Sequence, residues 1–101
     1  MAFELRWSRT ALEDIEGIAR YLAIEAPFYA NAVVTRIITV AENTVEFSLA
    51  GRSVPEWGNP EYRERFVYNY RIIYRVLHNS VIISAVMHGK RSIDSLEDRI
   101  E

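Results

Sequence analysis

The sequence predicts an α+β domain in which a helical hairpin packs on one face of a small, antiparallel-rich sheet, in the order strand, helix, helix, strand, strand, strand. Two amphipathic segments with helical spacing follow each other before residue 48 and are separated by Pro27. Three runs with the alternating or continuous apolar pattern of strands then occupy residues 62–91. A chain of 101 residues suffices for one modest core, so residues 1–101 are expected to form a single domain.

The first strand and the first helix occupy the N-terminal quarter of the chain. Residues 3–7 alternate apolar and polar side chains, as a strand would. A helix is then expected to start at Ser8 or Thr10, because Thr10-x-x-Glu13 has the form of a capping box. It should end before Pro27, since the residue that precedes a proline avoids the α region. Its apolar stripe comprises Ala11, Leu12, Ile15, Ile18, Ala19 and Leu22.

A second helix is expected over residues 28–47. Its apolar stripe comprises Ala30, Val33, Val34, Ile37, Ala41, Thr44 and Val45, while Asn31, Arg36, Glu42 and Glu46 lie on the other side. The connection between the two helices is very short, so they should pair antiparallel as a hairpin. Residues 48–60 lose the periodicity and contain glycines and prolines, which predicts a loop.

The parity of the strands suggests a sheet with one covered and one open face. In residues 70–76 one parity is Tyr70, Ile72, Tyr74 and Val76, which suits a core, and the other places Arg71 and Arg75 on a surface. Residues 81–87 are apolar almost throughout, as in a central strand that is covered on both faces. The resulting hypothesis is that guanidinium groups gather on the sheet face that the helices leave open.

Composition excludes several classes of function. No cysteine is present, so disulfides and thiolate chemistry are excluded. His78 and His88, ten residues apart, give no zinc spacing, and isolated glycines give no phosphate loop, so neither metal nor cofactor is expected. No run could span a membrane and residues 1–6 lack the apolar core of a signal peptide, which favours a cytoplasmic protein. Apolar residues at 93, 96 and 100 allow a short C-terminal helix.

Charge is distributed unevenly along the chain. Residues 52–91 contain seven basic and three acidic side chains, whereas the segments on both sides are net acidic. This pattern has two interpretations: an anionic partner for one face, or arginines that pair with acids of the same surface. The formal net charge of −2 is untypical of a nucleic-acid binder. Arginine nevertheless predominates over lysine, and its planar fork suits bidentate contacts to phosphate or carboxylate.

Several short motifs, in order, resemble the ParE/RelE superfamily, the toxins of bacterial type II toxin–antitoxin (plasmid stabilisation) modules. They are Trp7-Ser8 leading into Ala11-x-x-Asp14-Ile15-x-x-Ile18-x-x-Tyr21-Leu22, Gly51-Arg52-x-Val54-Pro55-Glu56, Arg63-Glu64, Tyr70-Arg71-Ile72-x-Tyr74-Arg75-Val76, and Val86-Met87-His88-Gly89-Lys90-Arg91. One departure is that residues 47–50 lack the proline usual in the family after the second helix.

This resemblance implies a function with two main alternatives. The ParE-like branch inhibits DNA gyrase, and the toxin is neutralised by a cognate antitoxin protein; this is the branch we favour. The RelE-like branch cleaves mRNA in the ribosome. A third alternative is an inactive homologue that retains only antitoxin binding. A homodimer or a toxin–antitoxin hetero-oligomer is compatible with each, and a role in the bacterial stress response follows from the resemblance.

The candidate binding residues for the target or the antitoxin are Arg52, Arg63, Arg65, Arg71, Arg75, His88, Lys90 and Arg91. An acidic, partly apolar antitoxin segment would lie among Ile73, Leu77 and Val67. If the protein were a ribonuclease, the catalytic candidates would be His88, Arg65 and Arg91.

Ribonuclease chemistry fits the sequence less well than target binding. Cleavage through the 2′-hydroxyl needs a proton acceptor, a proton donor and cations at the phosphate. In the ribonuclease branch a tyrosine or histidine after the last strand commonly contributes, but residues 92–101 contain neither and are acidic. His88 has the pattern of a packed strand-end residue. Tyr70 and Tyr74 share the core parity with Ile72, which favours packing.

Overall fold

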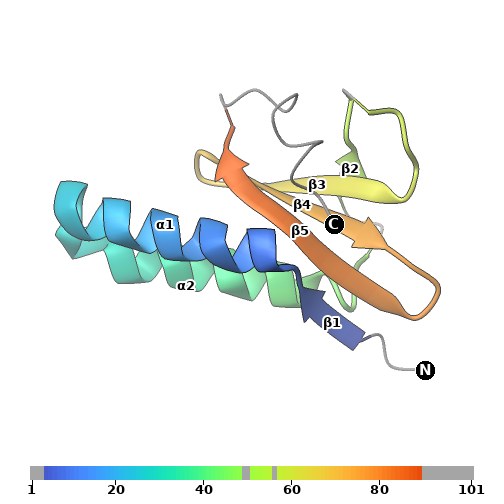
Figure 1. The fold of residues 1–101 in the computed structure, drawn as a ribbon, viewed down its shortest axis with the longest axis horizontal. Coiled ribbons are helices and arrows are strands. Elements are labelled where there is room, and N and C mark those ends of the chain that lie inside the picture. Colours follow the sequence, from blue (N-terminus) through green and yellow to red (C-terminus); the bar gives the residue numbers. More distant parts are fainter. Residues whose placement is uncertain (1–3, 49–50, 56, 90–101) are drawn as a thin grey trace.

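Two helices lie on one face of a five-stranded sheet (Figure 1). A computed structural model describes residues 4–48, 51–55 and 57–89. The elements are β1 (Glu4–Trp7), α1 (Arg9–Glu25), α2 (Pro27–Asn43), β2 (Arg52–Ser53), β3 (Tyr62–Val67), β4 (Tyr70–Val76) and β5 (Ser80–His88). The predicted α+β class and the order of helices and main strands are confirmed. The proposed C-terminal helix lies outside the described residues.

Ser8 caps α1, and the predicted capping box at Thr10 is wrong. The Ser8 side chain accepts a hydrogen bond from the Ala11 backbone N–H at 3.1 Å. Its hydroxyl also donates to the Ser84 carbonyl of β5 at 3.1 Å. Ser8 directly follows β1, and its side chain satisfies one of the free N–H groups at the start of the helix. Thr10 already lies inside the helix.

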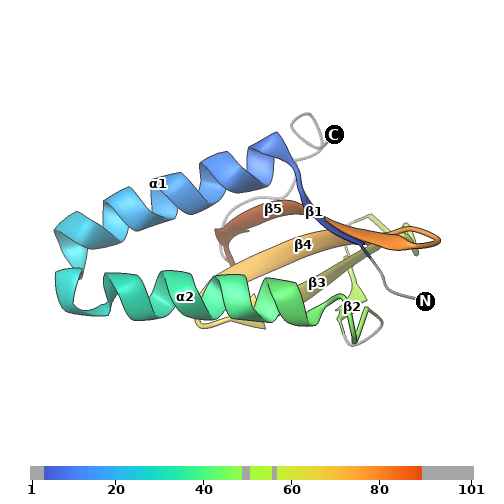
Figure 2. The same cartoon turned by 90° about the horizontal axis from the view of Figure 1, so that it is seen from below.

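The two helices form the predicted antiparallel hairpin (Figure 2). Pro27 occupies the first turn of α2, where its missing N–H costs nothing, and α1 ends two residues before it. α2 ends at Asn43 and not near residue 47 as predicted. From Thr44 to Glu46 the backbone N–H groups bond to carbonyls three residues back, and residues 44–46 continue as turns.

β5 lies between β1, which pairs with it in parallel, and β4, which pairs antiparallel. The predicted central position of this apolar run is confirmed. β2 was not predicted, because two residues beside glycine and proline give no periodicity. Arg52 and Ser53 nevertheless pair antiparallel with β3 and extend the sheet by one edge strand.

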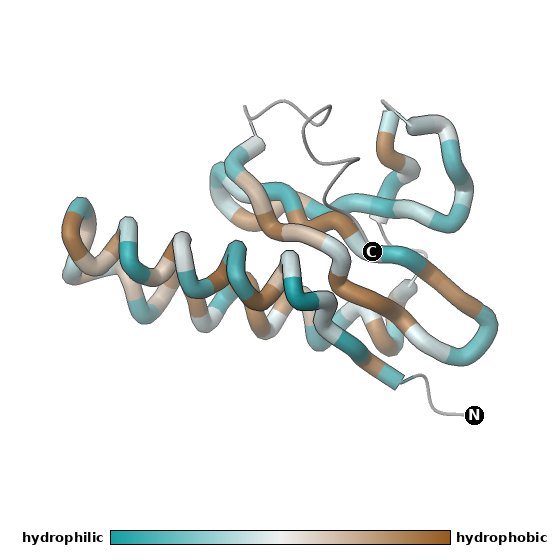
Figure 3. Tube along the Cα trace, in the orientation of Figure 1, coloured by the Kyte–Doolittle hydropathy of each residue, from teal (hydrophilic) through white to brown (hydrophobic). Residues whose placement is uncertain are grey.

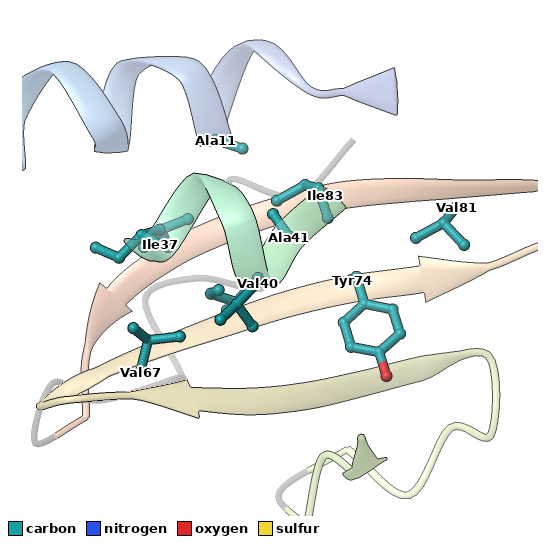
Figure 4. Close-up of a cluster of buried hydrophobic side chains, with 10 residues drawn as sticks. Ala11, Ile37, Val40, Ala41, Val67, Tyr74, Val81 and Ile83 are labelled. Atoms are coloured by element: carbon teal, nitrogen blue, oxygen red, sulfur yellow. The ribbon is translucent and has the colours of Figure 1, made fainter. Parts of the chain in front are cut away.

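The main core lies between the helices and the sheet. Ala11, Ile37, Val40, Ala41, Val67, Tyr74, Val81 and Ile83 are among its members (Figure 4). Figure 3 shows apolar positions recurring along both helices and concentrated in the central strands of the sheet. The core parity predicted for β4 is thus confirmed, with Ile72 and Tyr74 fully buried and Tyr70 and Val76 half-buried.

A second, smaller core covers part of the opposite sheet face. Val54, Ile73, Ala85 and Met87 are buried there, and Trp57 and Tyr62 pack against them. The face that the helices leave free is therefore not simply an open basic surface, because the segment around Val54 shields its centre. In the described part of the chain, neither helix has the length and apolarity needed to cross a bilayer.

Candidate functional site

The strand register divides the candidate arginines between the two faces of the sheet. Residues that face each other in an antiparallel ladder project to the same side. Arg63 faces Tyr74, and Arg65 faces Ile72, so both project to the helix side.

Arg71 and Arg75 project to the opposite side. Arg71 faces Phe66, and Arg75 faces Tyr62. The hypothesis of one guanidinium cluster on one open face is therefore wrong, although each arginine remains a candidate binding residue.

Glu64 is the centre of the face opposite the helices. One carboxylate oxygen accepts a hydrogen bond from Arg52 Nε at 2.6 Å. The other accepts from Arg71, with Nε at 3.0 Å and a second, shorter contact from Nη2. The exposed fractions of these side chains are 0% for Glu64, 6% for Arg71 and 63% for Arg52. Arg71, predicted to be a surface residue, is therefore buried, because Glu64 neutralises its charge inside the sheet face.

Phe66 extends this charged group with an exposed aromatic ring. The guanidinium carbons of Arg52 and Arg71 lie 5.4 Å and 5.9 Å from its centroid, within cation–π range. The ring is about half exposed. We call Arg52, Glu64, Phe66 and Arg71 the Glu64 clamp. It presents one accessible guanidinium and one aromatic surface beside a neutralised, buried ion pair.

The other candidate arginines in the described chain, Arg63, Arg65 and Arg75, have separate partners. Arg75 pairs with Glu61 at 2.9 Å, near the Tyr62 ring. Arg63 donates to the Gly51 carbonyl at 2.9 Å. Arg65 donates to the Asn43 side chain at 3.1 Å, at the end of α2. The interpretation that arginines pair with acids of the same surface is thus correct for Arg52, Arg71 and Arg75.

His88 is exposed at the end of β5, and its ring meets the Tyr70 ring edge-on with centroids 5.8 Å apart. Both residues line a groove beside α1. The expected packed strand-end histidine is therefore only partly correct, since one face of the ring is accessible. Lys90 and Arg91 lie outside the described residues.

The predicted antitoxin position between Ile73 and Val67 is wrong, because both side chains are buried and lie on opposite faces of the sheet.

Tyr74 holds the segment that leads into β2. Its hydroxyl accepts from the Gly51 N–H and donates to the Ser48 carbonyl, both at 2.9 Å. Sequence reasoning placed Tyr74 in the core but missed this role, and it missed Glu64 as well. The signal that could have found both is the adjacency of Gly51-Arg52 and Arg63-Glu64, which are paired in the structure.

The buried tyrosines are poor candidates for a general base. Burial raises the pKa of Tyr74 above 10.0, and it outweighs the opposing hydrogen bond from Gly51 and the nearby charges of Arg63 and Arg65. Burial also raises the pKa of Tyr70, as does the neighbouring Tyr21 hydroxyl. Neither phenol therefore provides a tyrosinate near neutral pH.

A pH titration should reveal these raised pKa values. The folded state favours the neutral phenol, so its contribution to stability is complete below the unfolded pKa of about 10. It is lost as the pH rises through the higher folded pKa. We expect the free energy of unfolding to fall above pH 10. Tyrosinate absorbance should show a late-ionising fraction that Tyr74→Phe reduces and that Tyr74→Phe together with Tyr70→Phe removes. A titration in which all tyrosines ionise together would contradict the assignment.

Within the described residues, no three histidine, aspartate or glutamate side chains gather closely enough to hold a metal ion. What the structure presents is a binding surface: the Glu64 clamp on one face, and the His88 groove and Arg65 on the other. The groove that His88 lines also contains the carboxylates of Glu13 and Asp14.

Comparisons with solved structures place this fold among toxin–antitoxin proteins. A chain of the chromosomal ParDE system from P. aeruginosa superimposes with a TM-score of 0.70 at 20% identity, covering 86% of this chain and 96% of that chain. A chain of the RelBE2 toxin–antitoxin complex from Mycobacterium tuberculosis gives a TM-score of 0.60 at 19% identity, covering 87% and 99%. A double mutant of the E. coli toxin RelE in the free state gives a TM-score of 0.62 at 16% identity, and the match covers 99% of this chain and 95% of that chain.

The fold is similar to the folds of these three chains. Residues 5–93 match the sequence model described as the ParE toxin of the type II toxin-antitoxin system parDE. The chain therefore belongs to the ParE toxin family. No curated protein gives a significant sequence match.

Proposed function

We propose that this toxin inhibits DNA gyrase, as expected of the ParE-like branch, and that a cognate antitoxin neutralises it. The family match supports the antitoxin partner. The chemistry of the described residues supports a binding function over RNA cleavage.

The observation that carries this proposal is the commitment of Arg52 and Arg71 to Glu64. A ribonuclease needs cations that stabilise the extra charge of a pentavalent phosphate. The single buried carboxylate at the centre of the clamp balances one of the two guanidinium charges, and it already accepts hydrogen bonds from the Nε atoms of both Arg52 and Arg71. These donors are therefore not available to a phosphate. The clamp therefore has the properties of a structural ion pair.

Acid–base chemistry supports the same proposal. Tyr70 and Tyr74 have raised pKa values, so neither supplies a base at neutral pH. His88 and Arg65, two of the three ribonuclease candidates, belong to separate sites: His88 lines the groove beside α1, and Arg65 lies beside the end of α2. In a ribonuclease, the proton acceptor and the phosphate-binding cation must act on the same scissile bond. The separation of His88 and Arg65 therefore supports a binding function over cleavage.

The antitoxin is proposed to bind at the accessible part of the Glu64 clamp. Phe66 offers an exposed apolar ring, and Arg52 an exposed guanidinium beside it. An acidic segment with an apolar side chain would complement this pair, and such segments often fold on binding.

Two assays run in parallel test the proposed target. Purified toxin is added to a gyrase supercoiling reaction and to a ribosome programmed with a reporter mRNA. We expect loss of supercoiling with intact mRNA. Cleavage of the mRNA at the ribosomal A site, with normal supercoiling, would overturn the gyrase proposal and establish the RelE-like alternative. Inactivity in both assays, with antitoxin binding retained, would identify an inactive homologue.

A double substitution tests the proposed target-binding residues. Arg65→Ala together with Arg91→Ala should abolish gyrase inhibition. Because surface substitutions typically change stability by less than about 0.5 kcal/mol, the fold should be retained. Arg9→Ala, at the exposed start of α1, is the matched control and should leave inhibition unchanged. A fully inhibitory double variant would contradict the assignment of these two arginines.

A further inference from the structure

The end of the helical hairpin carries an unusual concentration of exposed apolar side chains. Around the connection between α1 and α2, the exposed fractions are 60% for Tyr21, 78% for Ile24, 95% for Phe28 and 68% for Tyr29. Figures 1 and 2 show that this end of the hairpin runs past the sheet, so the sheet does not cover it. Single exposed apolar residues are ordinary, but four within nine positions at one tip indicate an interaction surface.

A groove lies beside this tip, between α1 and the end of β5. Its volume is about 340 Å³, and its walls include Gly17, Ile18, Tyr21, Tyr70 and His88. An engineered cavity of about 150 Å³ is enough to hold benzene, so a phenyl ring can enter a groove of this size. The aromatic rings on its walls provide suitable packing partners for another ring.

Gly17 gives the groove an opening that the isolated chain does not need. A Cβ atom placed on Gly17 would meet no atom within 4 Å. Glycine inside a helix costs roughly 0.5 to 1 kcal/mol relative to alanine. Its backbone has an ordinary negative φ, because Gly58 is the one described glycine with a positive value. The missing side chain leaves this wall of the groove open to a side chain of another molecule.

The groove does not favour strand addition. β5 extends beyond the residues that pair with β1, which would leave a free strand edge. Asp14 of α1, however, accepts a hydrogen bond from the Val86 N–H at 3.0 Å and so occupies this edge. A side chain that projects into the groove is therefore a better occupant than an added strand.

We propose that two copies of this chain associate through their hairpins, and that Phe28 of each copy inserts into the Gly17 groove of the other. Phe28 is the most exposed of the large apolar side chains in the described chain, and the same molecule carries the groove. A two-fold axis makes both contacts at once, because a surface with a projection and a matching recess is self-complementary.

The available area matches a modest dimer. Aromatic side chains bury on the order of 150 to 250 Å² each, so the four tip residues offer on the order of 500 Å² per copy. Two copies together would bury about 1,000 Å², the lower limit for a specific interface. The tip residues are apolar, and the groove is lined by the carboxylates of Glu13 and Asp14 as well. Neither nucleic acid nor an acidic peptide is therefore the favoured occupant. The inference is independent of the proposed gyrase activity.

Sedimentation velocity across a wide range of protein concentrations tests the proposal. The wild-type chain should shift from monomer to dimer as its concentration rises. Phe28→Ser removes the projecting ring, and Gly17→Trp fills the recess from a position where a Cβ atom meets no other atom within 4 Å. Each substitution should therefore weaken self-association at least tenfold. Phe47→Ser is the matched control, since Phe47 is exposed near the other end of α2, and it should still dimerise.

Mixing the two variants distinguishes this contact from a general loss of apolar surface. Phe28→Ser retains the recess and Gly17→Trp retains the ring, so a heterodimer restores one of the two contacts that each homodimer lacks. We expect dimer in the mixture at concentrations where each variant alone is monomeric. A wild-type monomer at every concentration, a Phe28→Ser variant that dimerises normally, or a mixture that stays monomeric would each overturn the proposal.

Discussion

Replacing Glu64 with glutamine is expected to lower the free energy of unfolding by about 3 to 5 kcal/mol, because it leaves the buried Arg71 guanidinium without its anionic partner. Glutamine keeps the shape of the side chain, but its amide group turns a donor toward one of the two guanidinium groups. Neither Arg71 nor Glu64 is accessible enough for water to replace the lost interaction.

Chemical denaturation measures this effect, and Glu61→Gln provides the matched control. Glu61 also pairs with an arginine from β4, but its side chain is 47% exposed, so the expected loss is below about 1 kcal/mol. Equal effects of the two substitutions would show that burial does not determine the strength of these ion pairs. Binding of the proposed antitoxin should also weaken for Glu64→Gln, since Arg52 loses its positioning partner.

Gly51→Ala should destabilise the protein by about 3 kcal/mol, at the upper end of the range for overpacking. A Cβ atom at this position would overlap the Tyr74 hydroxyl and would lie 2.6 Å from the Glu64 backbone carbonyl. One of these neighbours is backbone and the other is a buried ring, so neither can move away easily. The measurement is the denaturation midpoint, with circular dichroism to verify the remaining structure.

The same substitution at Gly17 should have the opposite sign. Alanine there meets no atom within 4 Å and favours the helix, so the free energy of unfolding should rise by roughly 0.5 to 1 kcal/mol. A destabilising Gly17→Ala together with a neutral Gly51→Ala would invalidate the packing described around both glycines.

The helices and main strands could be predicted from the sequence because their apolar residues recur with a clear period. Helical spacing determined the hairpin, and alternation in residues 70–76 identified Ile72 and Tyr74 as core residues. Boundaries were less predictable where local hydrogen bonds decide them. Ser8 begins α1 through its cap, and α2 ends where the backbone hydrogen bonds from Thr44 to Glu46 change to a three-residue span.

The face on which each arginine lies could not be read from parity alone. A two-residue turn joins β3 and β4, so odd-numbered residues of one strand face even-numbered residues of the other. Arg65 and Arg71 share parity in the sequence and therefore project to opposite faces. The length of that turn determines the outcome, and alternation within either strand does not reveal it.

The burial of Glu64 was equally hidden in the sequence. A charged residue in a strand is ordinarily placed on the surface, and only tertiary contacts bring two guanidinium groups to one carboxylate. The basic surplus of residues 52–91 consequently overstated the charge available to a partner, because three of its arginines form internal ion pairs.

The position of β5 has a consequence for how the toxin is made. It is the last strand of the described chain, yet its pairing with β1 joins residues as far apart as Glu4 and Ser80. An emerging polypeptide can form the helical hairpin early, but β1 finds its partner only after residues 80–83 have left the ribosome. The order of synthesis therefore makes the closing of the sheet a later step than the formation of the helices that cover it.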